Sequence, residues 1–275
     1  MDINLKVVGV GDNTVDIYVD NRECFPGGNC VNFSVFASRL GAQASYIGVL
    51  GSDENGDFLA KAMHNEKVNL KRVRFSKKRN SYTFIRHENK DRIFINSNPS
   101  TSQSLEINKE DLDFLSSHQL IHTSIYSKLE RYLPDLRALD FKISYDFSNR
   151  FSSIFMKNIL PWIDYGFFSW SGRNDENILT FLKKWTDLYK TELIVTNGIK
   201  GSYALNNNKL IHIPAKEIDL VDTMGVGDAF ITSYLISRLK GKIIKECIEE
   251  GTSFAAENCL HEGSFGYKRT YQEPF

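Results

Sequence analysis

The segment Asp222-Thr223-Met224-Gly225-Val226-Gly227-Asp228 places two glycines directly ahead of a predicted helix. Residues 229–239 carry apolar side chains at helical spacing, and Gly241 follows where a glycine often ends a helix. Glycine permits a tight turn, and the first N–H groups of a helix have no partner within the helix. Together with the helix dipole, these groups favour a bound anion. The segment therefore predicts an anion-binding turn.

Asp228 stands beside this predicted anion site. A carboxylate repels phosphate and is therefore a poor phosphate ligand. It is suited to act as a general base for a hydroxyl that attacks the phosphate. The alternative interpretation is an aspartate that caps the helix after a glycine turn.

A second pair of glycines leads into a helix at Pro26-Gly27-Gly28-Asn29-Cys30-Val31-Asn32. Asn29 and Asn32 are three residues apart, so they share a face of the predicted helix 29–40. Amide side chains offer donors and acceptors without charge, which suits sugar hydroxyls. Asn29 on its own is also typical of a helix cap.

A third polar segment, Gly11-Asp12-Asn13-Thr14-Val15-Asp16, follows the first predicted strand, residues 5–11. In a parallel α/β sheet, ligands collect beyond the carboxyl ends of the strands. Asp12 and Asp16 are therefore candidates to accept hydrogen bonds from paired hydroxyls. A polar turn with local side-chain bonding is the alternative.

Strand and helix patterns alternate along most of the chain. This alternation predicts an α/β fold with a mainly parallel central sheet and helices on both faces. The remaining predicted strands are residues 44–49, 120–123, 142–146, 165–168 and 193–196, and the remaining predicted helices are 57–66, 131–139, 152–160 and 176–189.

Two segments break this rhythm, residues 14–20 and 81–96. The second contains two strand patterns around the turn Glu88-Asn89-Lys90-Asp91. Both segments resemble a half-exposed antiparallel sheet, so we expect a small β lid over the active face. The alternative is that they are edge strands of the main sheet. The expected division is a core of residues 1–13, 25–70 and 97–275, with a lid of residues 14–24 and 71–96.

Composition argues against several partners. Lys plus Arg equals Asp plus Glu, at 34 each, so no basic field gathers nucleic acid or anionic lipid. The basic strip at residues 71–79 is typical of a solvated edge. No signal peptide and no membrane span is expected. The four cysteines match no zinc spacing, which indicates reduced thiols in a cytoplasmic protein, and no dedicated metal ligand is assigned.

The two glycine segments resemble the signatures of the ribokinase/pfkB carbohydrate kinase family. That family has Gly-Gly-x-x-x-Asn near the N-terminus and Asp-Thr-x-Gly-Ala-Gly-Asp near the C-terminus. Here both occur in the same order, about 195 residues apart, and the resemblance covers nearly the whole chain. It implies a ribokinase-like fold, with ATP and Mg²⁺ as cofactors and a small-molecule sugar as substrate.

The resemblance also implies roles for individual residues. Asp228 matches the catalytic base, and the backbone of Gly225, Val226 and Gly227 matches the anion hole. The positions implied to contact sugar or nucleotide fall into two sets. Those for the sugar are Asp16, Gly28 and Asn32, and those for the nucleotide are Thr196, Gly198, Gly201 and Asn258. The residue patterns add Asp12, Gly27 and Asn29 as candidates on the sugar side.

Within this family, four segments look most like the fructoselysine 6-kinase branch. They are residues 11–18, 26–29, 91–92 and 146–148. Members of that branch phosphorylate the 6-hydroxyl of an Amadori product, so the pocket must also seat an amino-acid tail. Arg92 is a candidate ligand for a carboxylate or a sugar oxygen, and an exposed strand arginine is the alternative.

The chain departs from the family pattern at three places. Val226 replaces the usual alanine, Ser148 replaces the asparagine of Asp-x-Asn-x-Arg, and residues 169–172 lack the Asn-x-x-Glu element that organises magnesium waters. Other hypotheses remain open: a kinase of another ketose, ribose, a nucleoside or a keto-sugar acid, or a non-catalytic sensor on the same fold. A Rossmann dehydrogenase is disfavoured because no GxGxxG follows the first strand. A homodimer through the lid is also expected.

Overall fold

The computed structural model describes residues 4–88 and 91–272, and for residues 87, 88, 91 and 92 the backbone only. Its main sheet has the strand order β14-β13-β12-β11-β10-β9-β1-β4. The strands from β12 to β4 are parallel, and a β13–β14 hairpin continues the sheet antiparallel. Their bounds are β1 Lys6–Val10, β4 Gln43–Ile47, β9 Leu120–Ser124, β10 Lys142–Asp146, β11 Tyr165–Ser169, β12 Glu192–Thr196, β13 Ser202–Asn206 and β14 Lys209–Ile213. The predicted α/β class is confirmed.

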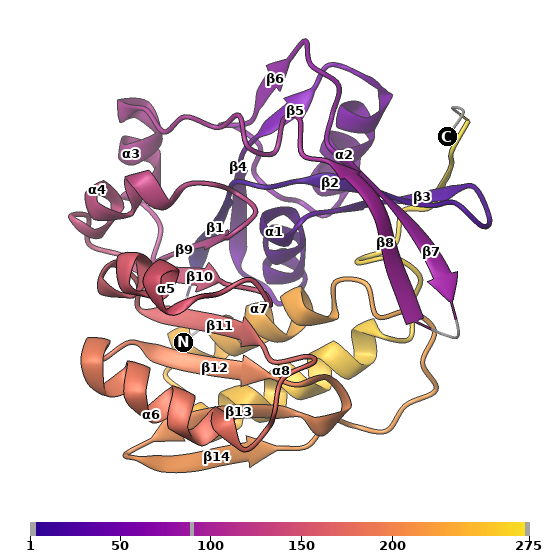
Figure 1. Cartoon of the computed structure of the whole chain (residues 1–275). Coiled ribbons are helices and arrows are strands. Elements are labelled where there is room, and N and C mark those ends of the chain that lie inside the picture. The colour runs from indigo at the N-terminus through magenta and orange to yellow at the C-terminus, as the bar shows by residue number, and fades with distance from the viewer. Residues whose placement is uncertain (1–3, 89–90, 273–275) are drawn as a thin grey trace.

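Helices cover both faces of this sheet (Figure 1). One face carries α3 (Lys109–Leu115), α4 (Leu133–Arg137), α5 (Ser153–Ile159) and α6 (Asn177–Tyr189). The other carries α1 (Asn29–Arg39), α7 (Val226–Leu239) and α8 (Ile244–Asn258). Short 3-10 turns lie at Glu130–Tyr132, Leu160–Trp162 and Gly198–Lys200. Because α7 is buried from Ala229 to Ser237, the glycine turn ahead of it is anchored in the core.

A second sheet stands apart from the first, in the order β15-β3-β2-β7-β8. Its bounds are β15 Arg269–Thr270, β3 Glu23–Gly27, β2 Thr14–Tyr18, β7 Tyr82–Glu88 and β8 Asp91–Asn98. In Figure 1, β7 and β8 form an arm on the side of the molecule toward which the arrowheads of β11 and β12 point. The alternative that these are edge strands of the main sheet is therefore wrong. Residues 89 and 90 of the expected turn lie outside the described residues.

The second sheet packs on α1 and on α2 (Glu54–Asn65) through a cluster of buried apolar side chains. Val15, Leu50 and Leu59 are fully buried there. Each such side chain contributes about 1.5–3 kcal/mol to folding. A separate pair, β5 (Val49–Gly51) and β6 (Arg74–Ser76), is parallel and forms its own small sheet.

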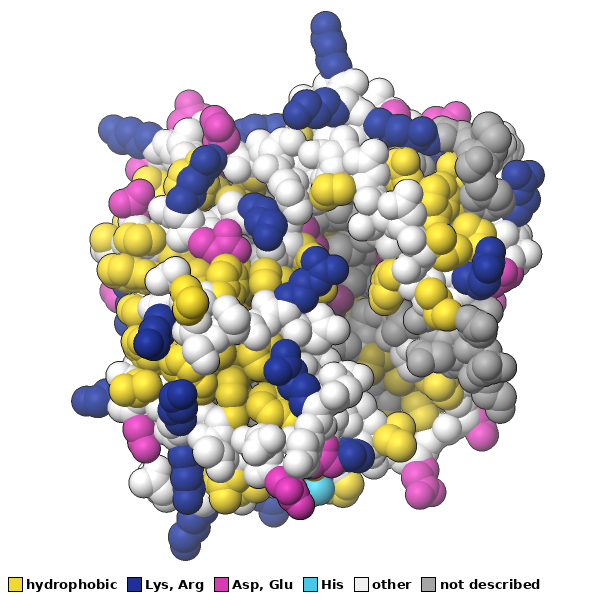
Figure 2. Space-filling model, viewed as in Figure 1, with side chains coloured by type: hydrophobic (Ala, Val, Ile, Leu, Met, Phe, Trp, Pro, Cys, Tyr) yellow, Lys and Arg dark blue, Asp and Glu magenta, His cyan; other side chains and the backbone are white. Residues whose placement is uncertain are grey.

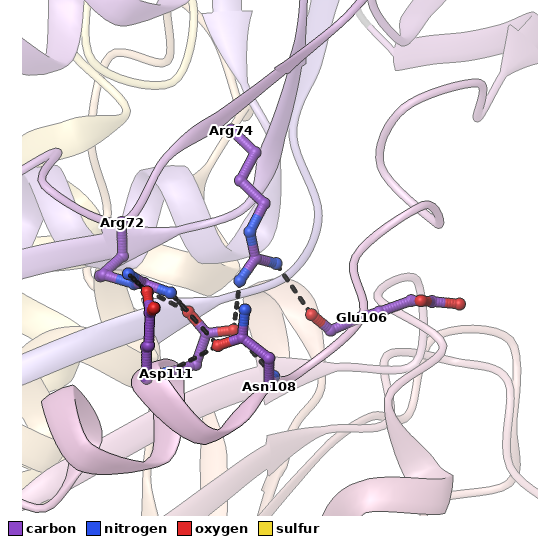
Figure 3. Close-up of polar contacts among 6 residues, drawn as sticks. Arg72, Arg74, Glu106, Asn108 and Asp111 are labelled. Atoms are coloured by element: carbon purple, nitrogen blue, oxygen red, sulfur yellow. Dashed lines mark hydrogen bonds and ion pairs between the residues drawn. The ribbon is translucent and has the colours of Figure 1, made fainter.

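Two arginines of the basic strip at residues 71–79 form ion pairs within the fold (Figure 3). Arg72 and Arg74 both pair with the carboxylate of Asp111, which is fully buried. Asp111 also closes a capping box with Asn108 at the start of α3. Burial would raise the pKa of Asp111, but the hydrogen bonds from Asn108, Arg74 and Arg72 hold it below its usual value. This cluster ties β6 to α3.

Candidate active site

Three segments that are distant in sequence meet at the carboxyl ends of the parallel strands. Asp12 follows β1 and Asp146 ends β10, while α1 and α7 both begin at this edge after glycine N-caps, Gly28 and Gly225. Figure 2 shows a hollow on this face, between the main sheet and the arm of β7 and β8, with acidic atoms inside it. This is where ligands bind in open α/β sheets.

The turn ahead of α7 has the geometry of an anion site. Gly225 has φ 69°, and a side-chain carbon placed on it would stand 2.7 Å from the Cβ of Ser264. A carbon placed on Gly227 would meet nothing within 4 Å, so the approach to this backbone is open. Within the described part of the chain, the amides of Gly227 and Asp228 donate to no protein oxygen. Val226 begins the helix, and its extra methyl groups pack against the neighbouring core. These amides are therefore available to a phosphate.

Asp228 does not cap the helix, because α7 has no side-chain cap hydrogen bond. Its Oδ2 instead accepts a hydrogen bond of 2.6 Å from Nδ2 of Asn32. Asp228 is half-buried. Burial raises its pKa well above the usual value, the carboxylates of Asp146, Asp12 and Asp16 raise it further, and the Asn32 bond lowers it. A carboxylate with a raised pKa is a better proton acceptor.

Asn29 also does not cap its helix. Its Nδ2 donates to Oδ2 of Asp146 at 2.6 Å, and its backbone N–H donates to Oδ2 of Asp12 at 2.7 Å. Asp146 is buried, and burial raises its pKa to about 6. It was not among the predicted site residues, although it ends a predicted strand and opens the Asp-Phe-Ser segment, a signal that could have identified it.

Asp12 is engaged by protein donors on both of its oxygens. Oδ1 accepts hydrogen bonds from Ser124 at 2.7 Å and from Ser127 at 2.9 Å, with Cys30 Sγ at 3.2 Å, and Oδ2 receives the Asn29 amide. Asp12 thus holds the end of β1, the end of β9 and the start of α1 together.

The glycines at 27 and 28 allow close approach of β2 and β3. A side-chain carbon on Gly27 would stand 2.4 Å from Oδ2 of Asp16, and one on Gly28, where φ is 106°, would stand 2.5 Å from the Cα of Asn13. Asp16 is buried, and its charge raises the pKa of Asp228, so the two carboxylates lie in the same region. The structure therefore brings Asp16, Gly27, Gly28 and Asn32 together.

Asp222 is a further residue of the site that sequence reasoning did not single out. Its Oδ2 accepts hydrogen bonds from the Tyr18 hydroxyl at 2.7 Å and from the Gly263 N–H at 2.9 Å. Its Oδ1 accepts from the Met224 N–H at 3.0 Å. The second sheet is thereby joined to the glycine turn.

The predicted nucleotide residues surround a second tight turn, at the end of β12. Thr196 ends the strand, Gly198 has φ 53° with open space around it, and Gly201 has φ 92° and lies against the Ile213 carbonyl. Asn258 lies elsewhere: its Nδ2 donates to the Met224 carbonyl at 3.0 Å, which braces the glycine turn. Arg92 lies in β8, and its side chain is outside the described residues.

Two observations concern metal and membrane. Among residues 4–88 and 91–272, no group of three or more His, Cys, Asp and Glu side chains is arranged to hold a metal ion. In the same residues, no helix is both long enough and apolar enough to cross a membrane.

Comparison with known sequences gives extensive matches. A family model described as pfkB family carbohydrate kinase matches residues 1–266. A fructosamine kinase (FrlD) of Bacillus subtilis (strain 168) is 35% identical over 273 residues, covering 98% of this chain and 95% of that protein. A fructoselysine 6-kinase of Escherichia coli (strain K12) is 28% identical over 256 residues, covering 93% and 98%.

Solved structures share the fold. Arabidopsis thaliana ribokinase complexed with ribose and ATP superposes with a TM-score of 0.82 at 18% identity, covering 96% of this chain and 95% of that one. A 2-dehydro-3-deoxygluconokinase of Thermotoga maritima gives a TM-score of 0.81 at 16% identity, covering 96% of each chain. The predicted ribokinase-like architecture is confirmed.

Proposed function

Because the chain belongs to the pfkB family of carbohydrate kinases, we propose that it transfers the γ-phosphoryl group of ATP to the 6-hydroxyl of a fructosamine such as fructoselysine. The chain is an ATP-dependent sugar kinase. The observation that carries the site assignment is the pairing of Asn32 with Asp228 beside amides that are open to a phosphate.

In the proposed reaction, Asp228 accepts the proton of the sugar hydroxyl as its oxygen attacks the γ-phosphorus in line. The new O–P bond forms while the bond to the bridging oxygen of ADP breaks, and ADP leaves. The backbone amides at Gly227 and Asp228 hold the equatorial phosphoryl oxygens, where negative charge is concentrated. Gly225 and Val226 shape the turn that presents them.

ATP is proposed to lie over the C-terminal half of the main sheet, between the turn at 196–201 and the end of α8. Exposed apolar side chains gather along these segments and suit an adenine ring: Ile199, Leu220, Val221 and Leu260. The Val221 N–H bonds the Cys259 carbonyl, so the segment before the glycine turn lies against the end of α8. Thr196 and Gly198 are proposed phosphate contacts, and Gly201 a contact near the base.

Mg²⁺ is proposed to arrive with the phosphates of ATP and to keep most of its water ligands. Residues 169–172 offer hydroxyls and no carboxylate, so they do not fit a dedicated magnesium site. No step of the mechanism is therefore assigned to a protein-held metal.

The sugar is proposed to bind to Asp16, Gly28 and Asn32, with Gly27 and Asn29 shaping the entrance. Asp12 is proposed as a positioning residue, because its oxygens already accept protein donors. Asn258 is likewise proposed to brace the glycine turn.

The second sheet is proposed to act as a lid, with β2, β3, β7 and β8 closing over the substrate and excluding water. Of the expected lid residues 14–24 and 71–96, β6 is left out of this proposal, because it pairs with β5 and is tied to α3. The edge strand β8 of the second sheet exposes Ile93, Phe94 and Ile95. Exposed apolar edge strands pair readily with another chain, so we also propose a homodimer through this edge. The cytoplasm remains the proposed location, supported by four cysteines that are buried thiols.

An assay of ADP release tests the proposed substrate. Purified protein with ATP and Mg²⁺ is supplied in turn with fructoselysine, fructose, ribose, a nucleoside and a keto-sugar acid. The proposal predicts the highest kcat/KM with fructoselysine and a product phosphorylated at C6. A higher kcat/KM with any other member of the panel, or a product phosphorylated elsewhere, contradicts it.

A further inference from the structure

The sugar side of the active site holds three carboxylates that have no cationic partner among the described residues. The charge of Asp12 raises the pKa of Asp146, and the charges of Asp146 and Asp12 raise the pKa of Asp228, so the three carboxylates lie near one another. Their hydrogen-bond partners are all uncharged: serine hydroxyls, the Cys30 thiol, asparagine amides and backbone N–H groups. Among the described residues, none of these three carboxylates forms an ion pair with a lysine, an arginine or a histidine.

A buried carboxylate elsewhere in this protein does have cationic partners. Asp111, which is buried like Asp12 and Asp146, pairs with two arginines (Figure 3). A buried carboxylate that lacks a cation is costly, and the cost is relieved when a positive charge binds nearby. The contrast favours a ligand that brings a positive charge to the carboxylates for which the described residues offer none.

An independent feature also calls for a donor from the ligand. Asn32 is only 3% exposed, and its amide Nδ2 bonds Asp228, so this side chain is directed into the carboxylate group. Its Oδ1 has no hydrogen-bond donor among the described residues. A buried acceptor of this kind is normally satisfied in the working state of a protein. A ligand rich in N–H or O–H donors would satisfy it.

The three carboxylates differ in how many further hydrogen bonds they can accept. Asp12 already accepts four donors, and Asp228 is assigned to the attacking hydroxyl. From the described residues, Asp146 accepts one donor on each oxygen, Asn29 on Oδ2 and the Ser148 N–H at 2.8 Å on Oδ1. A carboxylate oxygen has two lone pairs, so Asp146 can accept a further hydrogen bond on either one.

We propose that Asp146 binds the protonated secondary amine of the fructosamine and thereby selects this cationic sugar conjugate over neutral ketoses. Asn29 and Asn32, which hold Asp146 and Asp228, are three residues apart on α1, so their Cα atoms are about 4.5 Å apart along the helix axis. The two carboxylates are thus held at two different points along the start of this helix. In a fructosamine the amine stands on C1 and the accepting hydroxyl on C6, at opposite ends of the carbon chain. The inference rests on the proposed function, since it assigns the substrate of the same site.

The test compares two substrates that differ at one position: fructoselysine, and its ether analogue in which an uncharged oxygen without N–H donors replaces the C1 amine. Wild-type kcat/KM is expected to favour the amine by about 10- to 100-fold, the worth of a hydrogen bond between charged groups. Asp146→Asn is expected to abolish this preference, because kcat/KM for the amine falls by the same factor relative to kcat/KM for the ether. Any effect of the lost charge on Asp228 changes both kcat/KM values alike and leaves their ratio unaffected. Asp164→Asn serves as the control, because Asp164 precedes β11 and so lies at the amino ends of the parallel strands, away from the site. It is expected to change kcat/KM for neither compound.

The possible outcomes separate the inference from the function. Equal losses for amine and ether in Asp146→Asn, or no loss for either, overturn the inference and leave the kinase function standing. If Asp146→Asn does not fold, the wild-type comparison decides alone, because equal kcat/KM for the two compounds also overturns it. Failure of the wild type to phosphorylate either compound contradicts the proposed function, and the inference falls with it.

Discussion

Asn32 and Asp228 are 196 residues apart in the chain and are joined by a hydrogen bond of 2.6 Å between Nδ2 and Oδ2. Asn32 lies in the first turn of α1 and Asp228 in the first turn of α7. This bond therefore connects the segment proposed to hold the sugar with the segment proposed to hold the phosphate. It also opposes the burial that raises the pKa of Asp228.

Removing this bond is expected to shift the pH dependence of catalysis. Asp228 must be ionised to accept a proton, so kcat/KM falls as the pH drops through its pKa. Asn32→Ala removes the contact that lowers this pKa, and the acidic limb of the profile should move to higher pH. The measurement is kcat/KM against pH for both proteins. An acidic limb that stays in place would show that Asp228 is not the titrating base.

The two glycines of the anion turn are expected to respond differently to alanine. Gly225→Ala meets Ser264 and must adopt φ 69°, so it should lower the free energy of unfolding by about 2 kcal/mol or more. Gly227→Ala meets no atom within 4 Å and should preserve stability while hindering the phosphate. Chemical denaturation and the KM for ATP are measured on both variants. A stable, active Gly225→Ala protein would contradict the described turn.

Ionisation of Asp146 is expected to lower the free energy of unfolding. Burial raises its folded-state pKa from 3.8 to about 6, so the stability it contributes is full below about pH 4 and is lost as the pH rises through 6. Asparagine imitates the neutral form, and Asn29 can turn its amide to accept from it. Asp146→Asn should therefore raise the free energy of unfolding at pH 8 by at most about 3 kcal/mol. This gain in the free energy of unfolding should vanish at pH 4. Urea unfolding of both proteins at pH 8 and pH 4 measures it. An equal difference between the two proteins at both pH values would contradict the prediction.

The exposed edge of β8 is expected to mediate self-association. The double variant Ile93→Asp and Ile95→Asp places two charges on this edge and should convert a dimer into a monomer. Sedimentation velocity at micromolar concentration measures both proteins, with Leu188→Asp on exposed α6 as the matched control. A monomeric wild type, or a variant that remains dimeric, would reject the proposed interface.

Much of the architecture follows from short buried runs in the sequence. All the predicted core strands are present, because parallel strands covered on both faces are continuously apolar. The β13–β14 hairpin was not predicted, although its turn residues Asn207 and Asn208 have φ 48° and 62°, the left-handed pair that asparagine tolerates. The short α3 was also missed, and its signal was the capping box of Asn108 with Asp111.

The site was predictable where a motif contains both the turn and the reactive group, as at Gly225 and Asp228. The partners of these residues were not predictable in the same way. The contact of Asn29 with Asp146 spans 117 residues, and that of Tyr18 with Asp222 spans 204. Such pairs depend on how strands and helices are placed in space, which local sequence patterns do not contain. The helix itself begins at Val226 rather than at Ala229, so Asp228 lies within its first turn.

The proton acceptor at the start of α7 is tested most directly by Asp228→Asn. This variant keeps the size of the side chain and the contact with Asn32 but cannot take a proton. Phosphorylation of fructoselysine should slow by about 10²- to 10⁴-fold, while the Kd of ATP, measured by calorimetry, should change little. Turnover close to the wild-type rate would contradict the assignment of Asp228 as the base.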